Sequence, residues 1–466
     1  MPSTHAPMAR FTGTAWLPQF AQQQRRATSP TTSLHGLRGL AAVAVFLRHL
    51  LVTFFIIVDS GSPFPSKHPG LQLLRNYPFP LRLPFGGNAM VPVFFLISGY
   101  LDSAKPLTFI QTQSWGKLQG HLGGAILRRG PRLFLPALAA AAFSSLAIWL
   151  GLYTWGMSYR RICWPDELPP HLPRHINPLT QLGEMLKSFA ELLNLWEWEP
   201  VLPVVNIHYW TLPYDLRSSF IRYLVILGTA RLALTKRVAG MLVVVGFCGL
   251  WGRWEVVLSL AGTLLYQLDL SSGWLAAVSA EKEKRATRRT RWIYVALLVA
   301  SLYLCCFPKE NGDKTPGFRW LSWLTPKAWQ DYRWWNAWAA LTLVWVALHH
   351  PGISRFLEGP VPQYLGNISF SMYLTHGPVL HMTAHVLVPM VWSWKVFGRT
   401  LGFLVPVVVV VIPSVVLTVH VFSRTVENKI GQWIRRAENA WLETERPDGK
   451  REDGSRSAFE RAGALV

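Results

Sequence analysis

Apolar and polar stretches alternate along the chain, and the apolar ones have the length and spacing of membrane-spanning helices. A helix needs about 20 apolar residues to cross the hydrocarbon core of a bilayer. Ten such stretches run approximately over residues 37–58, 89–104, 131–153, 208–230, 238–251, 254–268, 291–307, 334–349, 364–392 and 401–422. Those at 89–104, 238–251 and 254–268 are short, which suits tilted helices or helices partly buried in protein. The pattern predicts an all-α polytopic membrane protein with about ten transmembrane helices.

The charges between these segments predict their orientation. Lys and Arg gather on alternate connections, which places those connections on the cytosolic side. These basic residues include Arg10, Arg25, Arg26, Lys105, Lys117, Arg128, Arg129, Arg231, Lys236, Arg237 and the run EKEKRATRRTR. The long connection 154–207 is instead rich in Asp and Glu. Both termini are therefore expected in the cytosol, with a segment 1–36, a transmembrane domain 37–422 and a charged tail 423–466.

Composition supports a membrane protein and argues against other classes. Of the 466 residues, 50% are hydrophobic and 15% are charged, whereas soluble domains carry about 25% charged residues. The net charge of +21 is explained by basic cytosolic loops and comes with no nucleic-acid-binding motif, so the expected partner is the lipid bilayer and not nucleic acid. Four cysteines are too few for a disulfide-stapled domain. Cys163, Cys305 and Cys306 fall on or near the non-cytosolic side, which allows one disulfide.

The first apolar segment contains two ionisable residues on one helix face. Arg38 and His49 are eleven positions apart, a spacing that returns to within about 20° of the same face and rises about 16.5 Å. Arg38 is therefore expected at the cytosolic surface and His49 near mid-bilayer. An ionisable residue inside a membrane is costly and suggests function. The pair fits the geometry of an acyl-CoA, with Arg38 at a phosphate and His49 at the thioester. Alternatively, Arg38 is an ordinary interfacial residue and His49 is hydrogen-bonded to a neighbouring helix.

Further charged residues lie within or beside apolar segments. Asp215 can orient a catalytic His, or pair with Arg222 on its own helix face or with Arg48. Arg129 and Arg132 are three apart, a spacing that can grip a phosphate or anchor the helix at the cytosolic surface.

Uncharged polar groups and histidines complete the candidate residues. Ser98 and Tyr100 flank Gly99, and Tyr373 and His376 share a helix face, so each pair either lines a substrate path or joins helices. No H-E-x-x-H motif or Cys cluster is present, so no metal site is expected. The sequence also contains no G-x-S-x-G, Walker A or Rossmann glycine pattern.

Five stretches occur in the order found in a known membrane family. They are GLRGLAAVAVFLRH, VFFLISGYLDS, RRGPRLFLPAL, YWTLPYDLRSS and LGNISFSMYLTHGPV, which lie between residues 36 and 379. In these stretches the chain resembles the integral-membrane acyltransferase-3 family, which includes bacterial sugar and polysaccharide O-acetyltransferases and fungal relatives. The form TLPYDLRSS is most similar to fungal members. The chain departs from the family pattern at Asp215, where Glu is usual, and at Leu50, where another His or an aromatic residue often follows the first-helix His.

The resemblance implies a membrane-embedded O-acyltransferase that uses acetyl-CoA as a co-substrate and holds no permanent cofactor. It implies that Arg38, Arg129 and Arg132 bind the acyl-CoA. His49 would act as general base or acyl relay, and Asp215 or His376 would orient it or the acceptor. The acceptor would be a hydroxylated lipophilic metabolite, such as a terpenoid alcohol, or a glycan. For a fungal protein the location would be the endoplasmic reticulum.

Two other functions fit the same pattern of buried charges. A transporter or flippase would use these charges as a translocation path, but no matched pair of broken segments recurs in the two halves of the chain. A non-catalytic scaffold would leave the Arg38–His49 spacing and the buried Asp215 unexplained.

Overall fold

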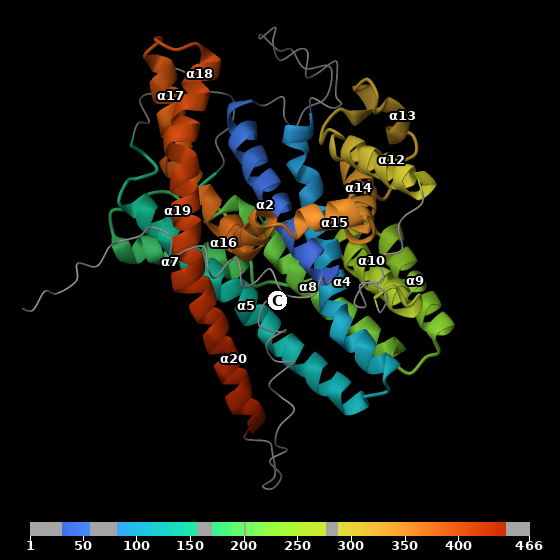
Figure 1. Ribbon diagram of the computed structural model, residues 1–466. Helices are drawn as coiled ribbons and strands as arrows, with labels where there is room; N and C mark the ends of the chain where they lie inside the picture. Colours follow the sequence, from blue (N-terminus) through green and yellow to red (C-terminus); the bar gives the residue numbers. More distant parts are fainter. Residues whose placement is uncertain (1–29, 56–81, 156–169, 200–201, 276–287, 444–466) are drawn as a thin grey trace, which may run out of the picture.

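The fold is entirely helical in the part of the chain that the computed structural model describes, which comprises residues 30–55, 82–155, 170–199, 202–275 and 288–443 (Figure 1). Each of the ten predicted segments coincides at least partly with a helix, so the all-α prediction is confirmed. Within these described residues, four helices are long and apolar enough to cross a membrane, namely Thr31–Phe54, Gly86–Gln111, Trp115–Trp149 and Arg399–Ala440.

The helices divide into a central group and a surrounding group. The central helices are α2 (Pro30–Phe54), α4 (Met90–Gln111), α5 (Trp115–Trp149), α8 (Thr211–Thr229), α10 (Trp254–Ser271), α14 (Asp331–His349) and α16 (Pro360–Met382). Around them lie α7 (Pro178–Glu191), α9 (Leu234–Leu250), α12 (Arg288–Cys305), α13 (Arg319–Ser322), α15 (Pro351–Leu357), α17 (Ala384–Ser393), α18 (Arg399–Pro406), α19 (Ile412–Phe422) and α20 (Asn428–Glu443). Short 3₁₀ turns are η2 (Leu83–Ala89), η3 (Ile207–Trp210) and η4 (Gly312–Lys314), and η5 (Val407–Val411) and η6 (Ser423–Glu427) are π turns.

The bounds of the helices differ from those of the predicted segments, and three of these differences bear on the site or the tail. α5 begins at Trp115 and passes through Pro131, so Arg129 lies within a helix and not in a loop. The segment predicted over 364–392 is divided at Thr383 into α16 and α17. The last segment continues through the π turn η6 into α20, so one long helix crosses the predicted start of the tail at residue 423 (Figure 1).

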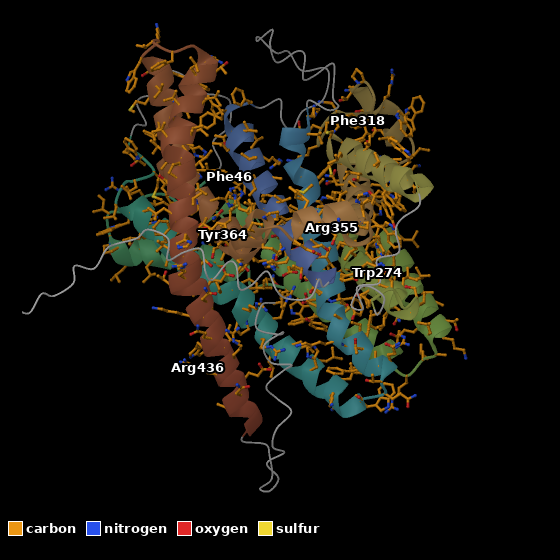
Figure 2. The ribbon with its side chains drawn as sticks, in the orientation of Figure 1. Phe46, Trp274, Phe318, Arg355, Tyr364 and Arg436 are labelled. Carbon is orange, nitrogen blue, oxygen red and sulfur yellow. The ribbon has the colours of Figure 1, made fainter. Side chains whose placement is uncertain are left out.

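Apolar side chains fill the space between the helices and also cover much of the outer surface. One buried cluster joins α2, α4, α8, α10 and α14, a second joins α5, α7 and α16, and a third joins α2, α16, α17 and α19. Phe46 and Tyr364 belong to the third cluster (Figure 2). Outside, large apolar side chains such as Val243 and Val409 are 71% and 66% exposed. Such an exposed apolar surface suits contact with lipid.

Close contact between two glycines fixes the packing of α2 against α16. A Cβ atom added at Gly39 would lie 2.3 Å from the backbone nitrogen of Gly366, and one added at Gly366 would lie 2.5 Å from the carbonyl oxygen of His35. Residues this small let helix backbones approach closely in a membrane. His49 and His376 each lie ten residues beyond these glycines on their helices. The two helices run in the same direction from the glycine contact, so equal rises along both axes bring the two histidines to one level.

We predict that Gly366→Ala lowers the thermal stability of the protein, because the new methyl group collides with backbone atoms of α2. Overpacking of this kind costs about 1–3 kcal/mol. The matched control is Gly246→Ala on the exposed face of α9, where an added Cβ meets nothing within 4 Å and Ala is the better helix former. The measurement is the unfolding temperature in detergent. Equal unfolding temperatures for the two variants would contradict the assigned contact.

Candidate active site

Three histidines from distant parts of the sequence meet inside the protein. His49 lies on α2, His208 on η3 and His376 on α16. His49 Nδ1 and His376 Nε2 are 2.8 Å apart, which is a hydrogen-bond distance. The His208 ring lies 4.0 Å from the His49 ring and 4.6 Å from the His376 ring, measured between centroids. His376 is 1% exposed, whereas His49 and His208 are partly buried.

His49 and His376 form a nearly planar pair. Their ring planes differ by 5° and their centroids are 5.0 Å apart. Rings this far apart whose facing nitrogens are only 2.8 Å apart must lie edge to edge. His208 is inclined by 25° and 29° to the two rings and packs against both. The three rings therefore consist of a hydrogen-bonded pair and a third ring stacked on it.

The first turns of α8 and the middle of α16 hold His208 in place. Tyr373 Oη donates a 2.6 Å hydrogen bond to the His208 carbonyl oxygen and lies 2.8 Å from Thr211 Oγ1. The Asn206 side chain accepts from the His208 backbone nitrogen at 3.1 Å. A Cβ atom at Gly377 would lie 2.8 Å from the His208 ring, so only glycine leaves room for this contact.

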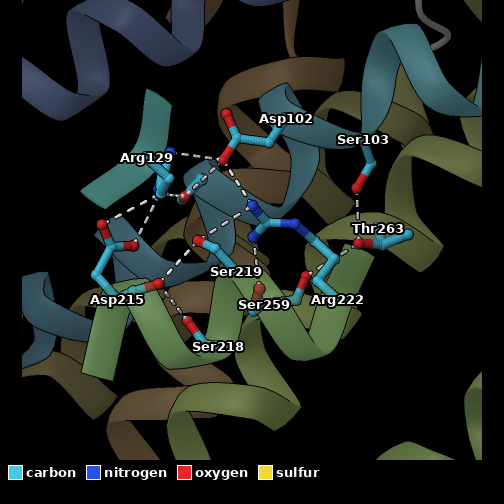
Figure 3. Close-up of polar contacts among 10 residues, drawn as sticks. Asp102, Ser103, Arg129, Asp215, Ser218, Ser219, Arg222, Ser259 and Thr263 are labelled. Carbon is cyan, nitrogen blue, oxygen red and sulfur yellow. Dashed lines mark hydrogen bonds and ion pairs between the residues drawn. The ribbon is translucent and has the colours of Figure 1, made fainter. Parts of the chain in front are cut away.

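A second polar group joins arginines and aspartates from α4, α5 and α8 (Figure 3). The Arg129 guanidinium binds Asp102 at 2.8 Å and both Asp215 oxygens at 2.9 and 3.1 Å. Arg222, which is 0% exposed, binds the same Asp102 oxygen at 2.6 Å and Ser259 at 2.6 Å. Asp102 thus lies between two guanidinium groups, and each of these partly or fully buried charges has an opposite charge beside it.

Ser98 belongs to this network, whereas Tyr100 belongs to another. Ser98 Oγ accepts from Arg129 at 2.7 Å and donates to Asp102 at 3.2 Å. Tyr100 Oη donates to Asp269 at 2.8 Å, and the other Asp269 oxygen lies 3.0 Å from His349 Nε2. Two residues of one predicted motif therefore face different polar groups.

The predicted acyl-CoA-binding arginines lie close to one another but differ in their contacts. Arg38 and Arg132 are close enough to each other and to Arg129 for their positive charges to repel. Arg129 is held by two carboxylates, whereas no hydrogen bond to the side chain of Arg38 or Arg132 is seen among the described residues. The Glu427 carboxylate of η6 is close enough to Arg38 and Arg132 to attract both charges, and it accepts a hydrogen bond from Ser371.

The structure assigns partners to two residues for which the sequence left alternatives. Asp215 binds Arg129 and not Arg222, which binds Asp102 instead. Of the two residues expected to orient His49 or the acceptor, His376 and not Asp215 is hydrogen-bonded to the His49 side chain. His49 and Asp215 therefore lie in two separate hydrogen-bonded groups.

Three residues that sequence reasoning did not single out are part of these groups. They are Asp102, His208 and Glu427. Asp102 lies in the stretch VFFLISGYLDS and His208 directly precedes YWTLPYDLRSS, so their positions in the sequence could have identified them as candidates. Glu427 lies in what was interpreted as a solvated tail, and only the continuation of the last helix brings it to the arginines.

The three histidines are close enough together to be considered as a metal site, since one nitrogen of each lies within 4.8 Å of the others. The arrangement nevertheless favours a hydrogen bond. Two nitrogens on one tetrahedral zinc are about 3.3 Å apart, given zinc–nitrogen distances of about 2.0–2.1 Å. The facing nitrogens of His49 and His376 are 2.8 Å apart, so a metal would require these rings to separate.

None of the cysteines that the structure describes belongs to the histidine group or to the arginine–aspartate group. Cys248, Cys305 and Cys306 are free thiols. Cys163, the third candidate for the expected disulfide besides Cys305 and Cys306, lies outside the described residues.

Comparisons with known proteins identify the family. The O-acetyltransferase PaAT-1 of Phomopsis amygdali is 29% identical over 79% of this chain and 76% of that protein. Acyltransferase clz18 of Cochliobolus lunatus is 24% identical over 87% of this chain and 95% of its own length, and acyltransferase R4 of a Phoma species is 24% identical over 88% and 96%. No solved structure matches the chain. The family model for the acyltransferase domain matches residues 31–419, and the chain therefore belongs to the acyltransferase-3 family.

Proposed function

We propose that this protein is a membrane-embedded O-acyltransferase that moves an acyl group, most simply acetyl, from acyl-CoA to a hydroxyl group. The observation that carries the proposal is the placement of two residues on α2. Arg38 lies among the arginines and His49 lies in the histidine pair, about 16.5 Å apart along the axis. An acyl-CoA extended along α2 would place its phosphates beside Arg38 and its thioester beside His49.

In the proposed reaction His49 is the general base. It takes the proton of the acceptor hydroxyl as the oxygen attacks the thioester carbonyl, a role for which a neutral imidazole is suited. The carbon–sulfur bond then breaks, and the CoA thiolate leaves with the proton that His49 held. The products are the ester and CoA, and His49 returns to its starting state.

The arginines have two proposed roles. Arg38 and Arg132 would bind the CoA phosphates, because phosphate can replace the more distant carboxylates as their counter-charge. Arg129 would instead position α5 against α4 and α8, since its guanidinium is already engaged by Asp102 and Asp215.

Acetyl-CoA is the proposed donor, and the name of the relative PaAT-1 supports acetyl over longer acyl groups. The proposed acceptor is a hydroxylated lipophilic metabolite, such as a terpenoid alcohol, or a glycan. A lipophilic alcohol is favoured because it would reach the interior from the bilayer. The proposed location is the endoplasmic reticulum membrane, with ten spans and both termini in the cytosol.

The first prediction is that His49→Ala lowers acceptor-dependent release of CoA from acetyl-CoA by about 10²- to 10⁴-fold, as expected for loss of a general base. The assay uses purified protein in nanodiscs with a panel of hydroxylated lipophilic and sugar acceptors. The matched control is His121→Ala, since His121 contacts the Phe109 ring away from the histidine pair. Normal turnover in His49→Ala would remove His49 from the reaction.

The second prediction separates phosphate binding from packing. Arg38→Met and Arg132→Ala should raise the KM for acetyl-CoA about tenfold or more, because each loses a charge-assisted bond. Acetyl-pantetheine lacks the nucleotide phosphates, so its KM should not change. Arg231→Ala, at an arginine that stacks on Trp115, is the control. Equal effects on both donors would show that these arginines do not bind phosphate.

The third prediction concerns topology. Gln113→Cys and Glu199→Cys are each introduced into a cysteine-free background, since both positions are exposed. In sealed microsomes with the cytosolic face outward, an impermeant maleimide should label position 113 directly. Position 199 should react only after detergent is added. Reaction of both positions before detergent would contradict the ten-span arrangement.

A further inference from the structure

The hydrogen bonds around His376 determine which of its nitrogens carries a proton. His376 Nδ1 lies 2.8 Å from the carbonyl oxygen of Met372, one turn earlier on α16. A carbonyl oxygen can only accept a hydrogen bond, so Nδ1 must carry the proton. In a neutral imidazole the other nitrogen then has a free lone pair. His376 Nε2 is therefore an acceptor.

The position of the proton on His376 in turn determines its position on His49, because the two rings are hydrogen-bonded. His49 Nδ1 faces the His376 Nε2 lone pair at 2.8 Å, in nearly one plane. Two lone pairs cannot face each other at this distance, so His49 Nδ1 carries a proton and donates it. A neutral His49 must then have a bare Nε2. The carbonyl of Met372 thus determines the tautomers of both rings in turn.

We propose that His376 is a positioning residue that fixes the tautomer of His49, so that His49 Nε2 is the nitrogen that takes the proton from the acceptor hydroxyl. The inference rests on the proposed function. His376 holds the position that an aspartate holds in a Ser-His-Asp triad, where a partner on Nδ1 sets the tautomer and orientation of the catalytic imidazole. Here that partner is a neutral imidazole.

The proton balance is complete within the proposed reaction. Nε2 of His49 takes the hydroxyl proton as the oxygen–acyl bond forms and the carbon–sulfur bond breaks. Nδ1–H stays bonded to His376 throughout, so the transient positive charge is shared by hydrogen bonding across the pair. Nε2 then gives its proton to the CoA thiolate, and both rings return to their initial tautomers.

His208 completes the arrangement by packing on both rings. Its ring covers the faces of His49 and His376, which opposes rotation of either ring out of the shared plane. Tyr373, next to Met372 on α16, holds His208 through its carbonyl oxygen. One stretch of α16 therefore supplies the carbonyl, the His376 ring and the anchor of His208.

The activity test compares two substitutions of His376. His376→Gln keeps an oxygen that can accept from His49 Nδ1–H, whereas His376→Leu keeps bulk but removes the acceptor. We expect His376→Leu to lower kcat by about 10²- to 10⁴-fold with an unchanged KM for acetyl-CoA, and His376→Gln to recover about tenfold or more of that loss. Thr375→Val is the matched control, because the Thr375 hydroxyl donates to the Ser371 carbonyl one turn earlier and has no other hydrogen bond among the described residues.

A spectroscopic test reports the tautomer without any acceptor. In protein labelled with ¹⁵N-histidine, the His49 signals are those that disappear in His49→Ala. We expect a protonated Nδ1 and a bare Nε2 in the wild type, and the opposite tautomer in His376→Leu. A protonated Nε2 in the wild type overturns the inference, whether or not an acceptor has been found and whether or not the Leu variant folds.

The outcomes distinguish this inference from the proposed function. Turnover that persists in His49→Ala removes the general base itself and with it the proposed site. Loss of turnover in His49→Ala together with full kcat in His376→Leu overturns only the positioning role. Equal losses in the Gln and Leu variants, with normal folding, also overturn it, because a hydrogen-bond acceptor would then not matter.

Discussion

The interior of this protein depends on the pairing of charges that are removed from water. Asp102 accepts hydrogen bonds from both Arg129 and Arg222, and Arg129 also binds Asp215. These contacts tie α4, α5 and α8 together, and the bond from Arg222 to Ser259 adds α10. Removal of Asp102 would leave the Arg222 guanidinium, which is 0% exposed, without this carboxylate partner, and an uncompensated buried charge costs about 3–5 kcal/mol. The four helices therefore form a rigid frame beside the candidate site.

The histidine group depends on a different constraint, which is how closely backbones can approach. Contact between Gly39 and Gly366 brings α2 and α16 together, and Gly377 lets the His208 ring touch α16. With the helices this close, the His49 and His376 rings reach each other directly. The apolar interior therefore contains two polar groups, the arginine–aspartate network and the three histidines. In the proposed function the histidine group faces the thioester, while Arg38 and Arg132, which lie close to the paired charges, face the CoA phosphates.

The part of the chain that matches the family model contains most residues of both polar groups. The family model covers residues 31–419, which include Arg38, His49, Asp102, Asp215 and His376. It does not reach Glu427, whose closeness to Arg38 and Arg132 arises because the last helix continues through η6. The contact between Glu427 and Ser371 therefore belongs to a part of the chain whose place only the structure reveals.

The sequence by itself determined the helical class and the register of residues within one helix. Apolar stretches of membrane-spanning length require helices, since backbone groups in lipid must bond within their own segment. Arg38 and His49 share a face for the same local reason. Which charges pair was decided only by tertiary structure, because Arg129, Asp102 and Asp215 come from three helices. The same holds for the three histidines. His49 and His376 meet because a glycine contact joins two helices more than 300 residues apart in the chain, and His208 packs beside them against Gly377.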